Sequence, residues 1–360
     1  MNKARILPLA VAACLACGTV STLASADQAY QVFVTNERSG DVTVINGADN
    51  KVIDTIAVGK RPRGIHASAD GSTLYVALSG TPVQAPPQLD ANGNPILKKG
   101  KDDDDDDDAK ADKAADGIGV VSIAQRKFLK KISVGSDPEE FAISKDGTRF
   151  YVSNEDFKAA SVVNIASGKI EHISQLGEEP EGVAVTPDGK RFYVTCESGG
   201  DIFIIDAAGF KTLGHLKVNP RPRSVAFLPD GSAAFVQSES TGEINVIDTT
   251  GFKVSKVITL PERSRPAHVL MSPDGTKLYV SNGRAATVSV LDPHSYALLD
   301  TIKVGTRPWG IAVTPDGKFL YSANGPSNDV SVVDLKTNKE ITRVKAGSSP
   351  WGVEVVPTAH

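Results

Sequence analysis

The chain has 360 residues, a formal net charge of −4 and 40% hydrophobic residues. This small net charge gives no reason to expect a nucleic-acid partner, and helical periodicity is absent after the first 26 residues. The length exceeds that of an ordinary domain, but a repeat array of this size can form one folding unit.

Residues 1–26 are organised like a secretory signal peptide. A basic start with Lys3 and Arg5 leads into an apolar stretch, and small residues precede Asp27 as a cleavage site. The apolar stretch is too short to span a membrane. A lipoprotein signal at Cys14 is a less favoured alternative. We therefore predict export to the periplasm or beyond, with no membrane span in the mature chain.

From residue 30 onward the chain repeats one unit, which is clearest at 307–347. The unit holds four short apolar runs rich in Val, Ile, Phe and Tyr, and the tight turn 315–317 separates the first two. A proline opens each unit, and successive prolines are 42–44 residues apart except for one interval of 76. They are Pro62, Pro138, Pro180, Pro222, Pro266, Pro308 and Pro350. This spacing predicts β-propeller blades.

The two ends of the repeat region set the number of blades. Only one strand, 351–356, follows the last opening proline, whereas 30–59 supplies the second, third and fourth strands of a unit without its first. Joining them hides sheet edges that would otherwise be free to aggregate. We predict an all-β, seven-bladed propeller over 27–360, with four antiparallel strands per blade and a C-terminal strand that joins three N-terminal strands.

The long interval contains an insertion at 80–116, between the second and third strands of the first complete blade. The insertion has almost no apolar residues, and it includes seven consecutive aspartates, Asp102–Asp108. Such a segment gains too little from burial to offset the entropy of ordering, so we predict a disordered acidic loop. A specific calcium site is disfavoured because Pro95 stands where a calcium-binding loop has glycine.

Three strings, at 33–45, 151–163 and 279–291, are similar to the YVTN repeat of bacterial β-propellers. The segment 59–80 and the polar insertion after it resemble the propeller family associated with pyrroloquinoline-quinone-dependent (PQQ-dependent) catabolism. This resemblance covers 30–356, is specific for the fold and is weakly specific for activity. It implies an exported protein found with quinoprotein alcohol dehydrogenases and a transporter.

One face of the predicted propeller carries the loops that open the blades and those that join second to third strands. Around the opening prolines the sequence places arginines and tryptophans: Arg61, Arg63, Arg221, Arg223, Arg265, Arg307, Trp309 and Trp351. After four of the second strands it places glutamates: Glu37, Glu155, Glu197 and Glu239.

We favour a monomeric binding or scaffold protein, accessory to periplasmic PQQ-dependent alcohol oxidation, without catalytic activity or a cofactor of its own. The arginine and tryptophan set would bind a periplasmic protein partner, such as a quinoprotein dehydrogenase or a transporter component, because these residue types dominate binding hot spots. Since the arginines lie in rim loops, we expect replacement of Arg221 and Arg223 by alanine to leave the melting temperature unchanged.

The alternative is a metal-dependent, lactonase-like hydrolase in which the four glutamates converge on a divalent cation at the channel mouth. His66 and His268 lie on channel-lining strands of blades that are not adjacent, which disfavours a catalytic pair. His66 replaces a small residue such as Ala184, so we expect a packed or hydrogen-bonded core histidine rather than a catalytic base. A quinone or haem enzyme is the weakest interpretation, because the sequence has no Cys-x-x-Cys-His motif.

Overall fold

The computed structural model describes residue 1 and residues 29–83 and 111–358. The predicted signal peptide and the Asp102–Asp108 run lie outside the described residues. Within the described ranges, no helix is long and apolar enough to cross a membrane.

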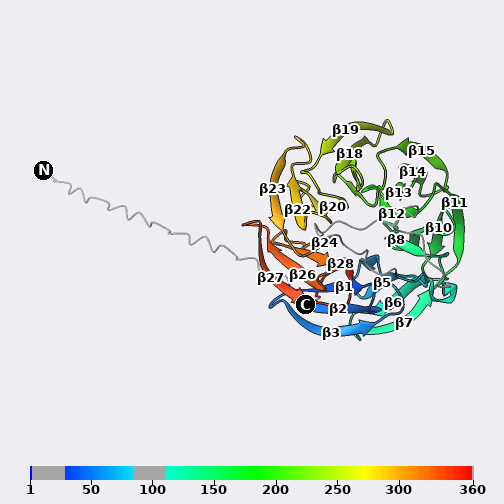
Figure 1. Ribbon diagram of the computed structural model, residues 1–360, viewed down its shortest axis with the longest axis horizontal. Helices are drawn as coiled ribbons and strands as arrows, with labels where there is room; N and C mark the ends of the chain where they lie inside the picture. The colour runs from blue at the N-terminus through cyan, green and yellow to red at the C-terminus, as the bar shows by residue number, and fades with distance from the viewer. Residues whose placement is uncertain (2–28, 84–110, 359–360) are drawn as a thin grey trace, which may run out of the picture.

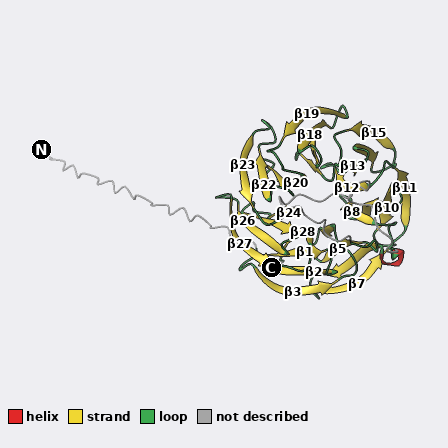
Figure 2. Ribbon diagram, viewed as in Figure 1, coloured by secondary structure: helices red, strands yellow, loops and turns green. Residues whose placement is uncertain are grey.

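Seven four-stranded antiparallel sheets surround a central channel, which confirms the predicted all-β, seven-bladed propeller (Figures 1 and 2). The first strands are β28 (Pro350–Pro357), β4 (Ile65–Ala67), β8 (Pro138–Ile143), β12 (Pro180–Val185), β16 (Val225–Phe227), β20 (Pro266–Met271) and β24 (Pro308–Val313). The second strands are β1 (Tyr30–Asn36), β5 (Thr73–Leu78), β9 (Arg149–Asn154), β13 (Arg191–Cys196), β17 (Ala233–Ser238), β21 (Leu278–Asn282) and β25 (Phe319–Asn324).

The third strands are β2 (Asp41–Asn46), β6 (Gly117–Ser122), β10 (Ala159–Asn164), β14 (Asp201–Asp206), β18 (Glu243–Asp248), β22 (Thr287–Leu291) and β26 (Asp329–Asp334). The fourth strands, on the outside of the ring, are β3 (Lys51–Ala57), β7 (Lys127–Ile132), β11 (Ile170–Gln175), β15 (Thr212–Lys217), β19 (Lys253–Thr259), β23 (Leu298–Lys303) and β27 (Lys339–Lys345). Blade 1 comprises β28 and β1–β3, and blades 2 to 7 follow in chain order.

Asp-Gly turns, such as the tight turn predicted at 315–317, connect first and second strands. In blade 7, Thr314 Oγ1 donates a hydrogen bond to the Asp316 carboxylate at 2.6 Å, and the backbone N–H of Lys318 donates to the same oxygen at 3.1 Å. Gly317 adopts a φ of +70°, which glycine reaches without steric cost. The turn is therefore stabilised by its own residues, which explains why the sequence alone predicted it.

Ring closure follows the predicted pairing. Strand β28 pairs antiparallel with β1, placing Val355 opposite Val32 and Val353 opposite Val34. The core lies between blades rather than inside any one of them, so that Phe33 of blade 1 packs in the same cluster as Leu74 of blade 2. Each blade thus depends on its neighbours for burial, as expected for a repeat array.

The described ends of the insertion are joined to the propeller. The backbone N–H of Asp112 donates to the carbonyl of Gly80 at 2.9 Å, and a short 3₁₀ helix, η1, covers Lys113–Ala115. The Asp116 carboxylate is buried and accepts from the backbone N–H of Gly80 at 2.7 Å. The segment between these ends lies outside the described residues, so the predicted disorder stays a prediction.

Candidate functional site

The first strands line the central channel in one register. In blade 2, His66 pairs with Tyr75 of the second strand, and in blade 1, Glu354 pairs with Phe33. The equivalent residues, each opposite a tyrosine or phenylalanine, are Ala142, Ala184, Ala226, Leu270 and Ala312. His66 and Glu354 therefore lie at the same level in adjacent blades, and we call this level the middle level.

Three residues earlier in each first strand is a second level, nearer the face with the opening prolines. We call it the mouth level, and it consists of Arg63, Glu139, Glu181, Arg223, Ala267, Trp309 and Trp351. Charged and aromatic side chains thus fill the mouth, whereas the middle level is mostly small and apolar apart from His66 and Glu354.

One ion-pair cluster joins the mouth of blades 1, 2 and 3. Arg63 Nε lies 2.9 Å from the Glu37 carboxylate, and Arg61 Nε lies 3.2 Å from the same oxygen. Arg63 also pairs with Glu139, whose side chain is fully buried, and Arg61 lies 3.6 Å from Asp137. Burial alone would raise the pKa of Glu37, but the two arginines outweigh it and hold that pKa below its ordinary value.

A second cluster of ion pairs joins the mouth of blades 4, 5 and 6. Burial alone would raise the pKa of Glu239, but Arg223 and the neighbouring arginines lower it to about 2. The contacts are Arg223 with Glu181 (2.9 Å), Glu239 (2.8 Å) and Glu197, Arg221 with Glu197 (2.9 Å) and Glu239 (3.3 Å), and Arg265 with Glu239 (3.2 Å).

Two tryptophans lie between these clusters. The rings of Trp309 and Trp351 stack with centroids 6.5 Å apart and an interplanar angle of 21°. Arg223 covers Trp309 at 5.4 Å, and Arg63 covers Trp351 at 5.9 Å. Arg307 lies 4.7 Å from the Trp309 ring. The tryptophans therefore form a continuous stack with arginines that belong to both ion-pair clusters.

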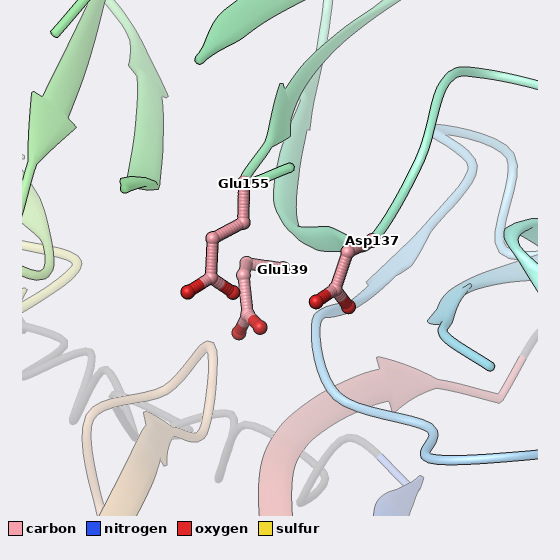
Figure 3. Close-up of side chains that lie close together, drawn as sticks. All are labelled: Asp137, Glu139 and Glu155. Atoms are coloured by element: carbon pink, nitrogen blue, oxygen red, sulfur yellow. The ribbon is translucent and has the colours of Figure 1, made fainter. Parts of the chain in front are cut away.

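Three carboxylates gather beside the first cluster. Oxygens of Asp137, Glu139 and Glu155 all lie within 4.8 Å of one another (Figure 3). Burial, together with the charges of Glu181 and Asp137, raises the pKa of Glu155 to about 8. Hard oxygen donors in this arrangement fit a divalent cation such as Ca²⁺ or Mg²⁺, whose charge would relieve the repulsion.

At the middle level, His66 Nε2 lies 3.0 Å from the Glu140 carboxylate and its ring packs edge-on against Phe141. Enclosure alone would lower the pKa of His66, but Glu140 raises it to about 9, so the imidazole is charged near neutral pH. Glu354 accepts a hydrogen bond from the Ala67 N–H at 3.1 Å. Enclosure raises the pKa of Glu354, offset in part by the charge of His66.

His268 reaches the same cavity from blade 6. Enclosure, with a further contribution from the charge of His66, lowers the pKa of His268 to about 4, so this imidazole is neutral. The cavity has a volume of about 630 Å³, and its lining includes His66, Glu140, His268, Trp309 and Glu354. Two histidines with oppositely shifted pKa values therefore line one cavity, a pattern typical of acid–base sites.

The structure separates the predicted site residues into different roles. Of the four glutamates predicted to share a cation, only Glu155 belongs to the carboxylate group in the described residues. The other three lie elsewhere around the mouth, in ion pairs with arginines. The predicted arginines and tryptophans do gather at one face, but largely in contact with that face's own residues.

Sequence reasoning did not connect Glu140 or Glu354 with His66. His66 packs against Phe141 and binds Glu140, in line with the expected packed or hydrogen-bonded histidine, but its side chain is also 38% exposed and lines the channel. Blades 2 and 6 are not adjacent, yet His66 and His268 interact electrostatically across the channel. Glu354 could have been found from the repeat, because it replaces an alanine at the position equivalent to His66.

Comparisons with known proteins agree with this fold. Residues 178–355 match the family model "Lactonase, 7-bladed beta-propeller", and residues 10–179 match a choice-of-anchor I domain. No curated protein in the comparison matches the chain.

Among solved structures, the chain resembles the periplasmic gluconolactonase PpgL of Pseudomonas aeruginosa, with 20% identity, a TM-score of 0.68 and coverage of 91% of this chain and 99% of PpgL. A candidate 6-phosphogluconolactonase of Bacteroides fragilis gives 18% identity, a TM-score of 0.69 and coverage of 92% and 98%. Hydrazine synthase of Kuenenia stuttgartiensis gives 22% identity, a TM-score of 0.68 and coverage of 85% of this chain and 92% of the matched chain. At these identities the likeness shows the fold.

The comparisons correct our favoured function. A lactonase family model matches the C-terminal half of the chain, and several similar structures bear lactonase names, so a scaffold role in PQQ-dependent oxidation is not supported. The resemblance to YVTN-repeat proteins is confirmed only as far as the seven-bladed fold. The misassignment arose because repeat strings encode blade geometry, whereas the channel residues that carry chemistry differ from blade to blade.

Proposed function

We propose that this protein is a lactonase-type hydrolase that opens small cyclic esters of the sugar-acid class inside the central channel. The observation that carries the proposal is the His66–Glu140 pair next to Glu354 in a cavity large enough for a sugar-sized ring. The lactonase match at 178–355 supports it, and that segment includes Trp309 and Glu354. The export signal predicted at 1–26 favours an activity in the periplasm or beyond.

The opening of a lactone by water requires a base for the water, a positive charge near the carbonyl oxygen and a proton for the leaving ring oxygen. Glu354 is suited to be the base, because enclosure raises its pKa and so strengthens the carboxylate as a proton acceptor. The proton that Glu354 takes from water can then pass to the leaving oxygen. The His66 imidazolium, paired with Glu140, supplies the positive charge in the cavity wall.

The mouth provides the walls of this site. Trp309 and Trp351 offer an apolar surface to the ring of the substrate, and their contacts with Arg223 and Arg63 fix their orientation. A divalent cation, which Asp137, Glu139 and Glu155 would hold, would add positive charge at the mouth.

The test is the hydrolysis of glucono-δ-lactone. Its rate is measured from the acid released in weakly buffered solution and is compared with the rate of spontaneous hydrolysis. We expect catalysis by the wild type and a loss of about 10²–10⁴-fold in Glu354→Gln, the usual contribution of a general base. His66→Asn should also lose activity. The matched control is His294→Asn, because His294 lies in an exposed turn.

Three results would overturn the proposal. They are a wild-type rate equal to that of buffer over a panel of sugar lactones, full activity in Glu354→Gln, or an equal loss in the control. Thermal melts of each variant separate a catalytic loss from unfolding.

A further inference from the structure

The loop that joins blades 5 and 6 is longer than most of its equivalents. Six residues, 260–265, separate the end of β19 from the opening proline Pro266, whereas four residues separate β23 from Pro308 and β27 from Pro350. The two additional residues account for the spacing of 44 between Pro222 and Pro266, where most neighbouring prolines are 42 apart. The chain therefore departs from its own repeat at this point of the mouth face.

The additional residues form a tight turn that presents Arg263. The backbone N–H of Ser264 donates a hydrogen bond to the carbonyl oxygen of Pro261 at 3.2 Å, and the Ser264 hydroxyl donates to the same oxygen. Arg263 is the third residue of this turn and has a φ of +65°, a conformation for which glycine or asparagine is the usual choice. An arginine at such a position adds strain to the backbone, which points to a role for its guanidinium.

Arg263 lines a groove with two further arginines, Arg265 and Arg284, and we call this space the rim groove. Its volume is about 530 Å³, which is within the range of small-molecule sites. The backbone N–H of Arg284 donates to the carbonyl of Ser264 at 3.2 Å, so the two arginine-bearing loops are tied together. Arg263 and Arg284 are exposed, and the side chain of Arg265 is 34% exposed. Among the described residues, none lines both the rim groove and the channel cavity, so the two are separate spaces.

The charges of the rim groove favour an anion. Its lining includes the carboxylates Glu239 and Glu262, and Glu239 already contacts Arg265 at 3.2 Å and Arg223 at 2.8 Å. Within the part of the chain that the structure describes, no carboxylate forms an ion pair with Arg263. A guanidinium donates two parallel N–H bonds to one carboxylate or phosphate group, which makes arginine the side chain best suited to these anions.

We propose that the rim groove is a second ligand site, separate from the channel, which binds the carboxylate or phosphate group of a small molecule between Arg263 and Arg284. Arg265 adds positive charge on the side of the mouth while it holds Glu239. A neutral sugar or lactone is not selected here, because it offers the arginines no charged acceptor. This inference concerns a different cavity from the proposed hydrolase site and does not depend on that activity.

The experiment is a titration with inorganic phosphate and, separately, with malonate, at constant ionic strength and followed by the arginine Nε–H signals in NMR spectra. The Arg263 signal, identified by its absence in Arg263→Gly, should move with either anion and reach saturation. The two probes distinguish the phosphate and carboxylate sources of the ligand. If neither anion moves the signal beyond the effect of sodium chloride, the inference is wrong.

Variants locate the bound anion. Measured through the Arg265 signal, Arg263→Gly should weaken anion binding by about 10–100-fold, the usual effect of losing hydrogen bonds to a charged group. The same variant should not lower the urea midpoint, because glycine adopts this φ without strain. The matched control Arg343→Ala, on the outer strand β27, and the channel variant Glu354→Gln should bind with wild-type affinity. Undiminished affinity in Arg263→Gly, or a loss in Glu354→Gln instead, would place the anion elsewhere and overturn the inference.

Discussion

Replacing Arg223 with alanine should destabilise the propeller strongly, contrary to our expectation from sequence that rim arginines are dispensable for stability. Arg223 contacts Glu181, Glu197 and Glu239, whose side chains are 8%, 3% and 7% exposed. Removing one partner of a buried ion pair leaves an uncompensated charge and typically costs about 3–5 kcal/mol. We expect a loss of this size for Arg223→Ala near neutral pH.

The pKa of Glu239 gives an independent measure of how much these ion pairs stabilise the fold. Its arginine neighbours lower it from 4.5 to about 2 in the folded protein, which corresponds to about 3 kcal/mol of stabilisation through this carboxylate. Because the folded pKa is depressed, this stabilisation is fully present above pH 4.5 and is lost as the pH falls through 2. The difference in the free energy of unfolding between wild type and Arg223→Ala should therefore decrease as the pH falls from 4.5 towards 2.

The assay is urea denaturation at pH 7 and at several values down to pH 3, for wild type, Arg223→Ala and Arg343→Ala. Arg343 pairs with Glu340 at 2.7 Å on an outer strand where its side chain is 43% exposed, so its loss should cost under about 1 kcal/mol. If Arg223→Ala is as stable as Arg343→Ala at pH 7, the buried carboxylates do not depend on Arg223 and the reasoning fails.

Three further predictions follow from closure, cation binding and His66. Deleting 350–357 should give a chain without cooperative unfolding by circular dichroism, because it removes buried Val353 and Val356 at about 1.5–3 kcal/mol each and leaves the inner edge of β1 unpaired. A cooperative, unshifted melt would contradict this. Calcium at about 100 times its Kd should stabilise the wild type by about 2.7 kcal/mol in thermal melts, and Glu155→Gln should abolish the shift; equal shifts in both would place the ion elsewhere. The pKa of His66 rises from 6.5 to about 9 on folding, so its contribution to the free energy of unfolding is complete below pH 6.5 and is lost as the pH rises through 9. Because the side chain is 38% exposed to channel water, we expect this loss to be about 1 kcal/mol. Urea titrations of His66→Asn should lack it.

The fold could be predicted from sequence because its determinants are local and repeated. Turns such as 315–317 hold together through their own residues, and the proline spacing fixes the blade length. The position of the last strand after Pro350 was sufficient to predict closure, because only one unit lacked a first strand. None of these inferences required knowledge of a contact between distant residues.

The site could be predicted only in part, because its contacts run between blades. The sequence placed Arg223 and Glu239 on one face, but it did not show that they bind each other rather than a ligand. The pairing of His66 with Glu140 crosses from blade 2 to blade 3, and the approach of His268 crosses the channel. Such contacts depend on ring curvature, which spacing along the chain does not encode.

Ring closure also sets the order in which this protein can be completed during synthesis. The pairing of Val34 with Val353 joins segments from the two ends of the repeat region, so blade 1 cannot form until 350–357 are available. Until then β1 presents an unpaired edge, the kind of surface that recruits other strands. A ribosome or an export channel that stalls near the C-terminus would therefore release an open ring, which proteases and chaperones can distinguish from the finished one.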